Sequence, residues 1–281
     1  MSERAAWIGR LTPVAVVVLL AAAWLLPAGG DLSFASPDRA ADERLTATLD
    51  ALPDEPLVLV GFDPDVGTYA EVRPTVRALL ADLLARDARL AFVSLTVEGR
   101  ALGSAELMRL ERNDANPTRL VDLGFIAGAE AGLVDLARGP RLPDDADGAV
   151  ARRVREEGMA AFDAVAIVGG NDLGPRSWIE QVAPRLEGEP PFVAVTPTVL
   201  LPEVQPYLAG GQLAASLSTP RDGAAYRATL ELDNLSRFLD TGDPRPLPIV
   251  LGMLVALAVL LQALGARVVG ALRAARARET G

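Results

Sequence analysis

Residues 57–71 read LVLVGFDPDVGTYAE, and they carry the clearest indication of the fold class. An apolar run ends in two aspartates, Asp63 and Asp65, and a glycine follows before a helical pattern begins. Short, continuous apolar runs that end in turn residues are typical of strands buried on both faces of a parallel sheet. The stretch therefore predicts a strand, a turn that carries two carboxylates, and a helix.

The same pattern recurs along the chain. Further strands are predicted at residues 90–95, 120–126, 164–168, 192–195 and 212–217. Helices are predicted at residues 69–87, 106–111, 130–138, 149–162, 177–186 and 224–239. Pro74 lies inside the first of these and is expected in its first turn or at a kink. This alternation predicts an α/β fold, with a Rossmann-like, mostly parallel sheet and helices on both faces.

Two uncharged apolar segments flank the predicted domain. Residues 11–27 are predicted to form a transmembrane helix or signal anchor, although they also fit the apolar part of a cleaved secretory signal. Residues 247–266 are long enough to cross a bilayer. Four arginines follow them at once, and such a cluster marks the cytoplasmic side. We therefore expect a protein of the cytoplasmic (inner) membrane with two spans and both termini in the cytoplasm.

These segments predict a division of the chain into six parts. They are a cytoplasmic tail at 1–10, the first span at 11–27, a tether with one short helix at 28–54, an extracytoplasmic α/β domain at 55–245, the second span at 247–266 and a basic cytoplasmic tail at 267–281.

Charge is distributed unevenly over these parts. Of 27 basic and 37 acidic side chains, only two of the acidic ones lie outside the stretch between the spans, which is therefore strongly acidic. Such a surface repels phosphate, so nucleic acid is not an expected partner. The expected partners are the lipid bilayer and either a membrane protein or a second copy of the chain.

Histidine and cysteine are absent from the sequence, and every basic residue is an arginine. This composition removes thiol nucleophiles, imidazole bases and Schiff-base lysines. Any chemistry would have to come from carboxylates, hydroxyls, arginines and backbone groups. No cofactor is expected.

In an open parallel sheet, ligands bind beyond the carboxyl ends of the strands. Eight residues at the predicted strand ends and helix starts form the candidate ligand site: Asp63, Asp65, Thr68, Glu130, Gly170, Asn171, Asp172 and Thr196. Two interpretations of the first turn remain open. Its aspartates bind a divalent metal ion, or Pro64 stiffens the turn and either Asp65 or Thr68 caps the following helix.

The order of a strand, Asp63, Pro64, Asp65 and a nearby threonine resembles the first motif of the haloacid-dehalogenase-like phosphatases. The resemblance implies that Asp63 attacks phosphorus and that Asp65 acts as acid and base beside Mg²⁺. That family places its threonine two residues after the second aspartate, where this chain has Gly67, and Thr68 comes one residue later. The family's later lysine has no counterpart here.

The order of a span, an extracytoplasmic α/β domain and a closing span resembles the auxiliary membrane subunits of gliding-motility-type ABC exporters. The resemblance is one of arrangement, and it implies an accessory role without assigning functional residues. The expected function is a non-catalytic, membrane-anchored binding or scaffolding subunit of a membrane protein complex. The alternative is a metal-dependent hydrolase or phosphotransferase that uses Asp63 and Asp65.

Overall fold

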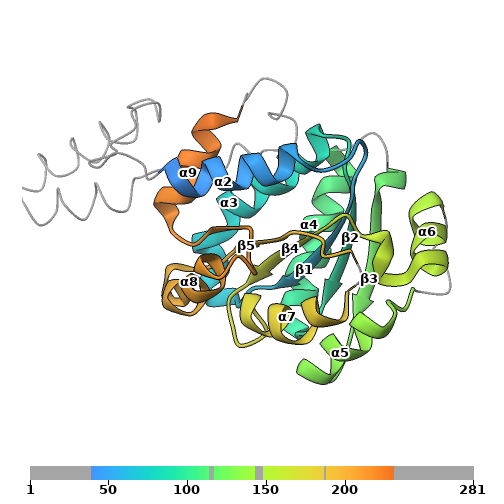
Figure 1. Ribbon diagram of the computed structural model, residues 1–281. Helices are drawn as coiled ribbons and strands as arrows, with labels where there is room; N and C mark the ends of the chain where they lie inside the picture. Colours follow the sequence, from blue (N-terminus) through green and yellow to red (C-terminus); the bar gives the residue numbers. More distant parts are fainter. Residues whose placement is uncertain (1–38, 114–116, 143–147, 187, 231–281) are drawn as a thin grey trace, which may run out of the picture. The chain divides into compact units, whose positions relative to one another are not determined.

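The computed structural model describes residues 39–113, 117–142, 148–186 and 188–230 (Figure 1). The strands are β1 (Leu57–Asp63), β2 (Arg89–Ser94), β3 (Leu120–Phe125), β4 (Ala164–Gly169), β5 (Phe192–Val195) and β6 (Ala215–Leu217). The helices are α2 (Arg39–Asp50), α3 (Val66–Ala85), α4 (Val97–Asn113), α5 (Glu130–Arg138), α6 (Ala149–Glu157), α7 (Pro175–Gln181), α8 (Leu201–Ala209) and α9 (Pro220–Thr229). Short 3-10 turns are η1 (Pro117–Arg119), η2 (Gly158–Ala161), η3 (Ala183–Arg185) and η4 (Thr198–Leu200).

The predicted spans at 11–27 and 247–266 lie outside the described residues, as do the two predicted tails. Within the described ranges, no helix combines the length and the apolar character needed to cross a bilayer.

The six strands form one sheet in the order β3-β2-β1-β4-β5-β6, and every pairing between neighbours is parallel. This is the strand order of Rossmann-type doubly wound folds. Strands β1, β4 and β5 are buried along their whole length, which explains their unbroken apolar runs. The predicted α/β class with a parallel sheet is confirmed.

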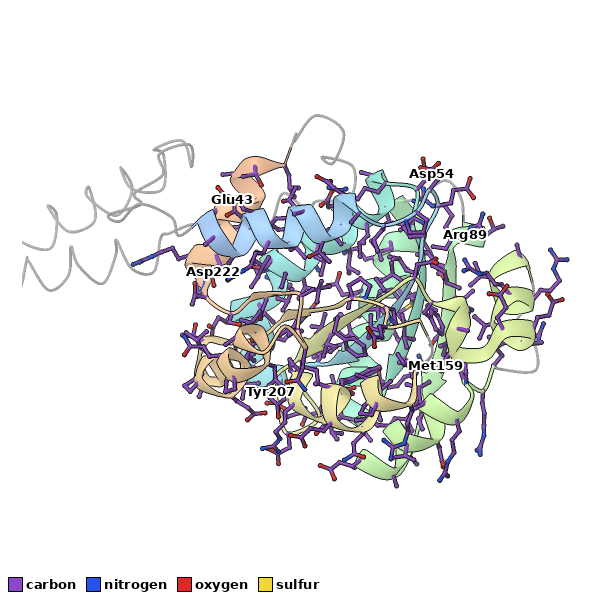
Figure 2. The ribbon with its side chains drawn as sticks, viewed as in Figure 1. Glu43, Asp54, Arg89, Met159, Tyr207 and Asp222 are labelled. Atoms are coloured by element: carbon purple, nitrogen blue, oxygen red, sulfur yellow. The ribbon has the colours of Figure 1, made fainter. Side chains whose placement is uncertain are left out.

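Helices cover both faces of this sheet, with an apolar cluster beneath each layer (Figures 1 and 2). Helices α2, α3, α4 and α9 cover one face, which receives Val58, Val60 and Phe62 of β1. Helices α5, α6, α7 and α8 cover the other face, which receives Leu57 and Leu59. Alternate residues of one strand thus serve two cores, as the two-residue period of a strand requires.

Helix α2 lies within the stretch predicted as a tether, but it packs against the rest of the domain. Leu45 and Leu49 of α2 are buried in the first apolar cluster. Asp50 of α2 accepts a hydrogen bond of 2.5 Å from Arg86, the residue that follows α3. The folded domain therefore includes α2, although two leucines four residues apart form too short an apolar face to indicate this in the sequence.

Helix α4 extends over Val97–Asn113, whereas only residues 106–111 were predicted to be helical. Gly99 and Gly103 interrupt the apolar pattern at the start of this helix. A Cβ atom at Gly99 would lie 2.4 Å from the backbone oxygen of Phe62, and one at Gly103 would lie 3.3 Å from the Phe62 ring. The glycines therefore allow α4 to pack closely against β1.

Prolines account for two further differences from the prediction. Pro74 is the ninth residue of α3, which begins at Val66, so it lies beyond the first turn. Helix α8 was not predicted, and it contains Pro206 as well as a proline in its first turn. Proline lowers helix propensity strongly, so neither feature could be read from the local pattern.

A buried ionic cluster joins α3 to α4. The carboxylate of Glu106 accepts hydrogen bonds from Tyr69 (2.7 Å), Arg77 (2.7 Å) and Arg109 (2.6 Å). Burial would raise the pKa of Glu106, but the hydrogen bonds from Arg77 and Arg109 outweigh burial and lower it. The carboxylate is therefore ionised in the folded domain at neutral pH.

Candidate functional site

Asp63 is the last residue of β1, and only 1% of it is exposed. Its Oδ1 atom accepts hydrogen bonds from the backbone N–H groups of Leu95 and Thr96, both at 2.8 Å, and from the Thr96 hydroxyl at 2.9 Å. Its Oδ2 atom is buried and has no hydrogen-bond partner among the described residues. The Asp63 side chain thus holds the β2–α4 turn against the end of β1.

Burial raises the pKa of Asp63 from 3.8 to about 6, although the hydrogen bonds from Leu95 and Thr96 partly offset this effect. A proton on Oδ2 would remove the buried charge and leave Oδ1 free to accept the same three bonds. Buried carboxyl groups with raised pKa values occur at active sites and also in structural networks. The raised pKa of Asp63 is therefore compatible with either role.

Thr96 is part of this site, although it was not among the eight residues of the predicted ligand site. Its hydroxyl donates to Asp63 and accepts a hydrogen bond of 2.9 Å from the backbone N–H of Gly99, in the first turn of α4. Thr96 therefore acts as the N-cap of α4 and joins this helix to β1. A threonine that directly follows a strand and precedes a helix was the available signal.

The turn after β4 packs directly against the turn after β1. The Asn171 side-chain amide donates to the backbone oxygen of Asp63 (3.0 Å) and to Oδ1 of Asp65 (3.3 Å). A Cβ atom at Gly170 would lie 2.6 Å from the Thr68 hydroxyl oxygen and 2.9 Å from the backbone nitrogen of Asp65. Five of the predicted site residues thus come together between β1 and β4, where the strand order reverses. Their polar groups contact one another.

The predicted position of the helix N-cap is correct, but the predicted capping by a side chain is not. Asp65 is the N-cap residue of α3 and has an extended backbone, but its side chain makes no capping hydrogen bond. The Thr68 hydroxyl donates to the backbone oxygen of Asp65 at 3.4 Å. The N–H of Val66 donates instead to the carboxylate of Glu98, also at 3.4 Å.

The other three predicted site residues are not linked to Asp63 by a hydrogen bond or ion pair in the described structure. Thr196 is buried, and its hydroxyl donates to that of Ser218 at 2.9 Å. Glu130 begins α5, and Asp172 is an exposed residue of the β4–α7 turn. Among the described residues, no group of three or more His, Cys, Asp or Glu side chains is placed to hold a metal ion.

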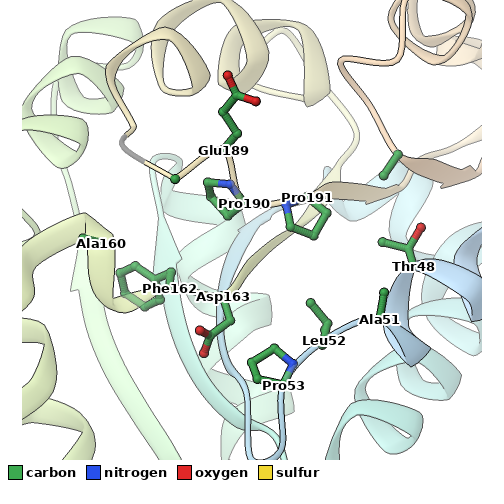
Figure 3. A pocket seen from close by; sticks show the side chains of 12 residues that line it. Thr48, Ala51, Leu52, Pro53, Ala160, Phe162, Asp163, Glu189, Pro190 and Pro191 are labelled. Carbon is green, nitrogen blue, oxygen red and sulfur yellow. The ribbon is translucent and has the colours of Figure 1, made fainter.

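A cavity of about 580 Å³ lies at the opposite edge of the sheet, near the starts of β1, β4 and β5 (Figure 3). Its lining is mainly apolar and includes Leu52, Pro53 and Phe162. Asp163 also lines it, but its carboxylate accepts a hydrogen bond of 2.7 Å from the N–H of Leu57 and pairs with Arg153 at 3.3 Å. The Asp163 carboxylate is thus engaged within the protein.

The side chains at the carboxyl edge of the sheet can carry out few kinds of reaction. Asp63 can exchange a proton at Oδ2, and the polar groups around it hold three turns together. The sequence supplies no histidine or cysteine to act beside it.

Comparison of the chain with protein-family models finds no matching family, and comparison with curated proteins finds no match either.

Proposed function

We propose that this chain is a non-catalytic, membrane-anchored binding or scaffolding subunit of a membrane protein complex, which presents its α/β domain outside the cytoplasm. The main support is the internal hydrogen bonding of the strand-end turns. The N–H groups of Leu95, Thr96 and Gly170 all donate to Asp63, and the Asn171 amide joins the turns after β1 and β4.

This hydrogen bonding differs from what a small-molecule site requires. Sites at this edge of an α/β sheet use backbone N–H groups and a few convergent polar side chains to bind the ligand. Here those groups bind one another, so the turns form a fixed surface. A fixed surface suits recognition of another protein, because little ordering is left to be done on binding.

The sequence supplies the second support. Two uncharged apolar segments flank the domain, and arginines lie on the outer side of each, as expected for two spans with cytoplasmic ends. The resemblance to auxiliary subunits of ABC exporters belongs to the same proposal. Both lines support a domain that lies beside the membrane, near the spans of a partner.

The hydrolase or phosphotransferase alternative has one observation in its favour, the buried and unpartnered Oδ2 atom of Asp63. A carboxylate oxygen of this kind could bind a cation. The Asp63→Asn variant separates the two proposals, and its expected behaviour opens the Discussion.

The subunit proposal is tested by the mass of the particle that contains the full chain. Membranes that contain the chain at its natural level are solubilised in a mild detergent, and the mass is measured by native electrophoresis. We expect a particle well above the mass of one chain in a micelle, and the same sample in a denaturing detergent serves as the control. A lone monomer under mild conditions would remove the proposal's main expectation.

The topology is tested separately, by labelling of introduced cysteines. The natural chain contains no cysteine, so each variant carries a single thiol. Glu189→Cys places a thiol in an exposed turn of the domain, and Arg276→Cys places one in the basic tail. In sealed cells, a membrane-impermeant maleimide is expected to label the first variant and to label the second only after lysis. Labelling of both before lysis would contradict the two-span topology.

A further inference from the structure

Five large apolar side chains are exposed in the described part of the chain, and four of them lie at the carboxyl edge of the sheet. We call these four the apolar row: Val66, Val97, Phe125 and Val199, with exposures of 64%, 75%, 45% and 72%. Val66 and Val97 begin α3 and α4, Phe125 ends β3, and Val199 lies in η4 after β5. Four separate turns thus place apolar side chains at one edge.

The members of the row are distributed along this edge, from the end of β3 to the turn after β5. Phe125, Val97 and Val66 follow the consecutive strands β3, β2 and β1, and neighbouring strands are about 4.8 Å apart. The N–H of Val66 donates to Glu98, the residue after Val97. Farther along the sheet, Glu71 of α3 accepts hydrogen bonds from the N–H (2.9 Å) and the hydroxyl (2.6 Å) of Thr198, the residue before Val199.

The buried polar contacts beneath the row fix its position. Asp63 holds the turn that carries Val97, and Asn171 holds the turn that carries Val66. Exposed apolar side chains that gather in one region mark an interaction site, whereas single ones scattered over the surface have no such meaning. Four of the five exposed ones among the described residues lie along this edge, and the turns of Val66 and Val97 are held in place, so we interpret the row as an interface.

The charges around the row indicate the partner's chemistry. Five acidic side chains that are exposed or half-buried stand at the same edge: Asp65, Glu71, Glu98, Glu130 and Asp172. Among the basic residues there, Arg100 binds Asp122 at 2.5 Å and Arg176 lies 3.7 Å from Glu203, while Arg73 is half-buried. The edge therefore carries exposed apolar and acidic side chains together, and two copies facing each other would bring like charges together.

We propose that the apolar row docks a segment of a partner protein whose apolar side chains are flanked by arginine or lysine. The partner's apolar side chains pack on Val66, Val97 and Val199, and its basic groups pair with Glu98 and the other acids. This inference rests on the proposed function, because it assigns the partner-binding surface of that subunit.

The experiment is site-specific photo-cross-linking in the full chain, within its own membranes. Val97 or Val199 is replaced by p-benzoylphenylalanine, and mass spectrometry maps the peptide that becomes attached. Met108 is the matched control, because it is also exposed and lies on α4 about 16 Å farther along the helix, at 1.5 Å per residue. The same experiment is repeated with Glu98→Arg as a second change.

We expect both strand-end positions to give an adduct with another protein and the Met108 position to give none. The attached peptide should carry apolar residues next to arginine or lysine. Glu98→Arg should lower the adduct yield at Val97 about tenfold or more, because it turns an attraction into a repulsion.

Three results would overturn the docking proposal. An adduct with a second copy of this chain would assign the row to self-association, and an attached peptide without basic residues would remove the charge argument. If no adduct forms at Val97 or Val199 while native electrophoresis still shows a complex, the docking surface lies elsewhere and the subunit proposal stands. If the complex is also absent, the subunit proposal itself fails.

Discussion

Replacing Asp63 by asparagine should stabilise the domain at pH 8, although it alters a buried residue at the candidate site. The asparagine Oδ1 can accept the same three hydrogen bonds from Leu95 and Thr96. The asparagine Nδ2 takes the place of Oδ2, which has no hydrogen-bond partner among the described residues. The main change is therefore the loss of a buried negative charge.

The size of the effect follows from the pKa of Asp63, which rises from 3.8 to about 6 on folding. Because the folded state binds this proton more tightly, the protonated Asp63 stabilises the folded domain. This contribution is fully present below pH 3.8 and is lost as the pH rises through 6. At 1.36 kcal/mol per pKa unit, the ionised carboxylate costs about 3 kcal/mol at pH 8. Asp63→Asn should thus be nearly neutral at pH 4 and stabilising by up to about 3 kcal/mol at pH 8.

The assay is urea unfolding of residues 35–241 at several pH values between 4 and 8, followed by tryptophan fluorescence. Trp178 is the one tryptophan in this fragment, since the other two of the chain precede it in the sequence. Trp178 is fully buried and packs against Gly61 of β1, close to Asp63. The contributions of other titrating groups cancel when the unfolding free energy of the variant is subtracted from that of the wild type. The Asp65→Asn variant controls for the loss of a neighbouring charge.

Two results together would refute this reasoning. The first is a loss of more than about 2 kcal/mol for Asp63→Asn at pH 8, a size typical of breaking a buried charged interaction. The second is stabilisation by Mg²⁺ of the wild type but not of the variant, since a ligand stabilises only the state that binds it. Asp63 would then be a cation ligand, and the hydrolase or phosphotransferase alternative would become the better proposal.

Three further predictions concern packing and the buried ions, and urea unfolding of the same fragment measures each. Gly61→Ala should destabilise the domain by about 2–3 kcal/mol, because its Cβ would lie 2.3 Å from the Trp178 ring; a neutral effect would show that the ring can move aside. Gly223→Ala should cost about 1–3 kcal/mol, because its Cβ would lie 1.9 Å from the Thr75 hydroxyl oxygen, and adding Thr75→Ala should recover part of this loss. Glu106→Gln should cost about 3 kcal/mol at pH 7, because it removes the carboxylate charge that accepts hydrogen bonds from Arg77 and Arg109. The lowered pKa of Glu106 makes its contribution to wild-type stability disappear as the pH falls through that pKa, so the difference should shrink in acid; an unchanged difference would contradict this reasoning.

The strands could be predicted because their environment leaves a direct trace in the sequence. A central parallel strand such as β1 has both faces buried, so the residues before its final Asp63 are all apolar or small. All six predicted strands overlap the observed ones. Helices with a clear apolar face were also found, and α5 has the predicted bounds of 130–138.

Helices that depend on contacts with distant parts of the chain were predicted poorly. The first turns of α4 contain glycines because they pack against Phe62, and α2 has few apolar residues because it covers only the margin of the core. In both cases the local pattern is weak, and tertiary packing supplies the stabilisation that local propensity lacks.

The α/β class, the strand positions and the residues at the carboxyl edge follow from local patterns of apolar and turn residues. The role of those edge residues follows from contacts between distant parts of the chain. Asp63 finds its donors 32 and 33 positions away, and Asn171 reaches back 108 positions to the end of β1. Strand order and register create these contacts, and neither has a local signature. Whether a carboxylate is open to a ligand or engaged by the protein's own backbone therefore depends on which turns the sheet brings together.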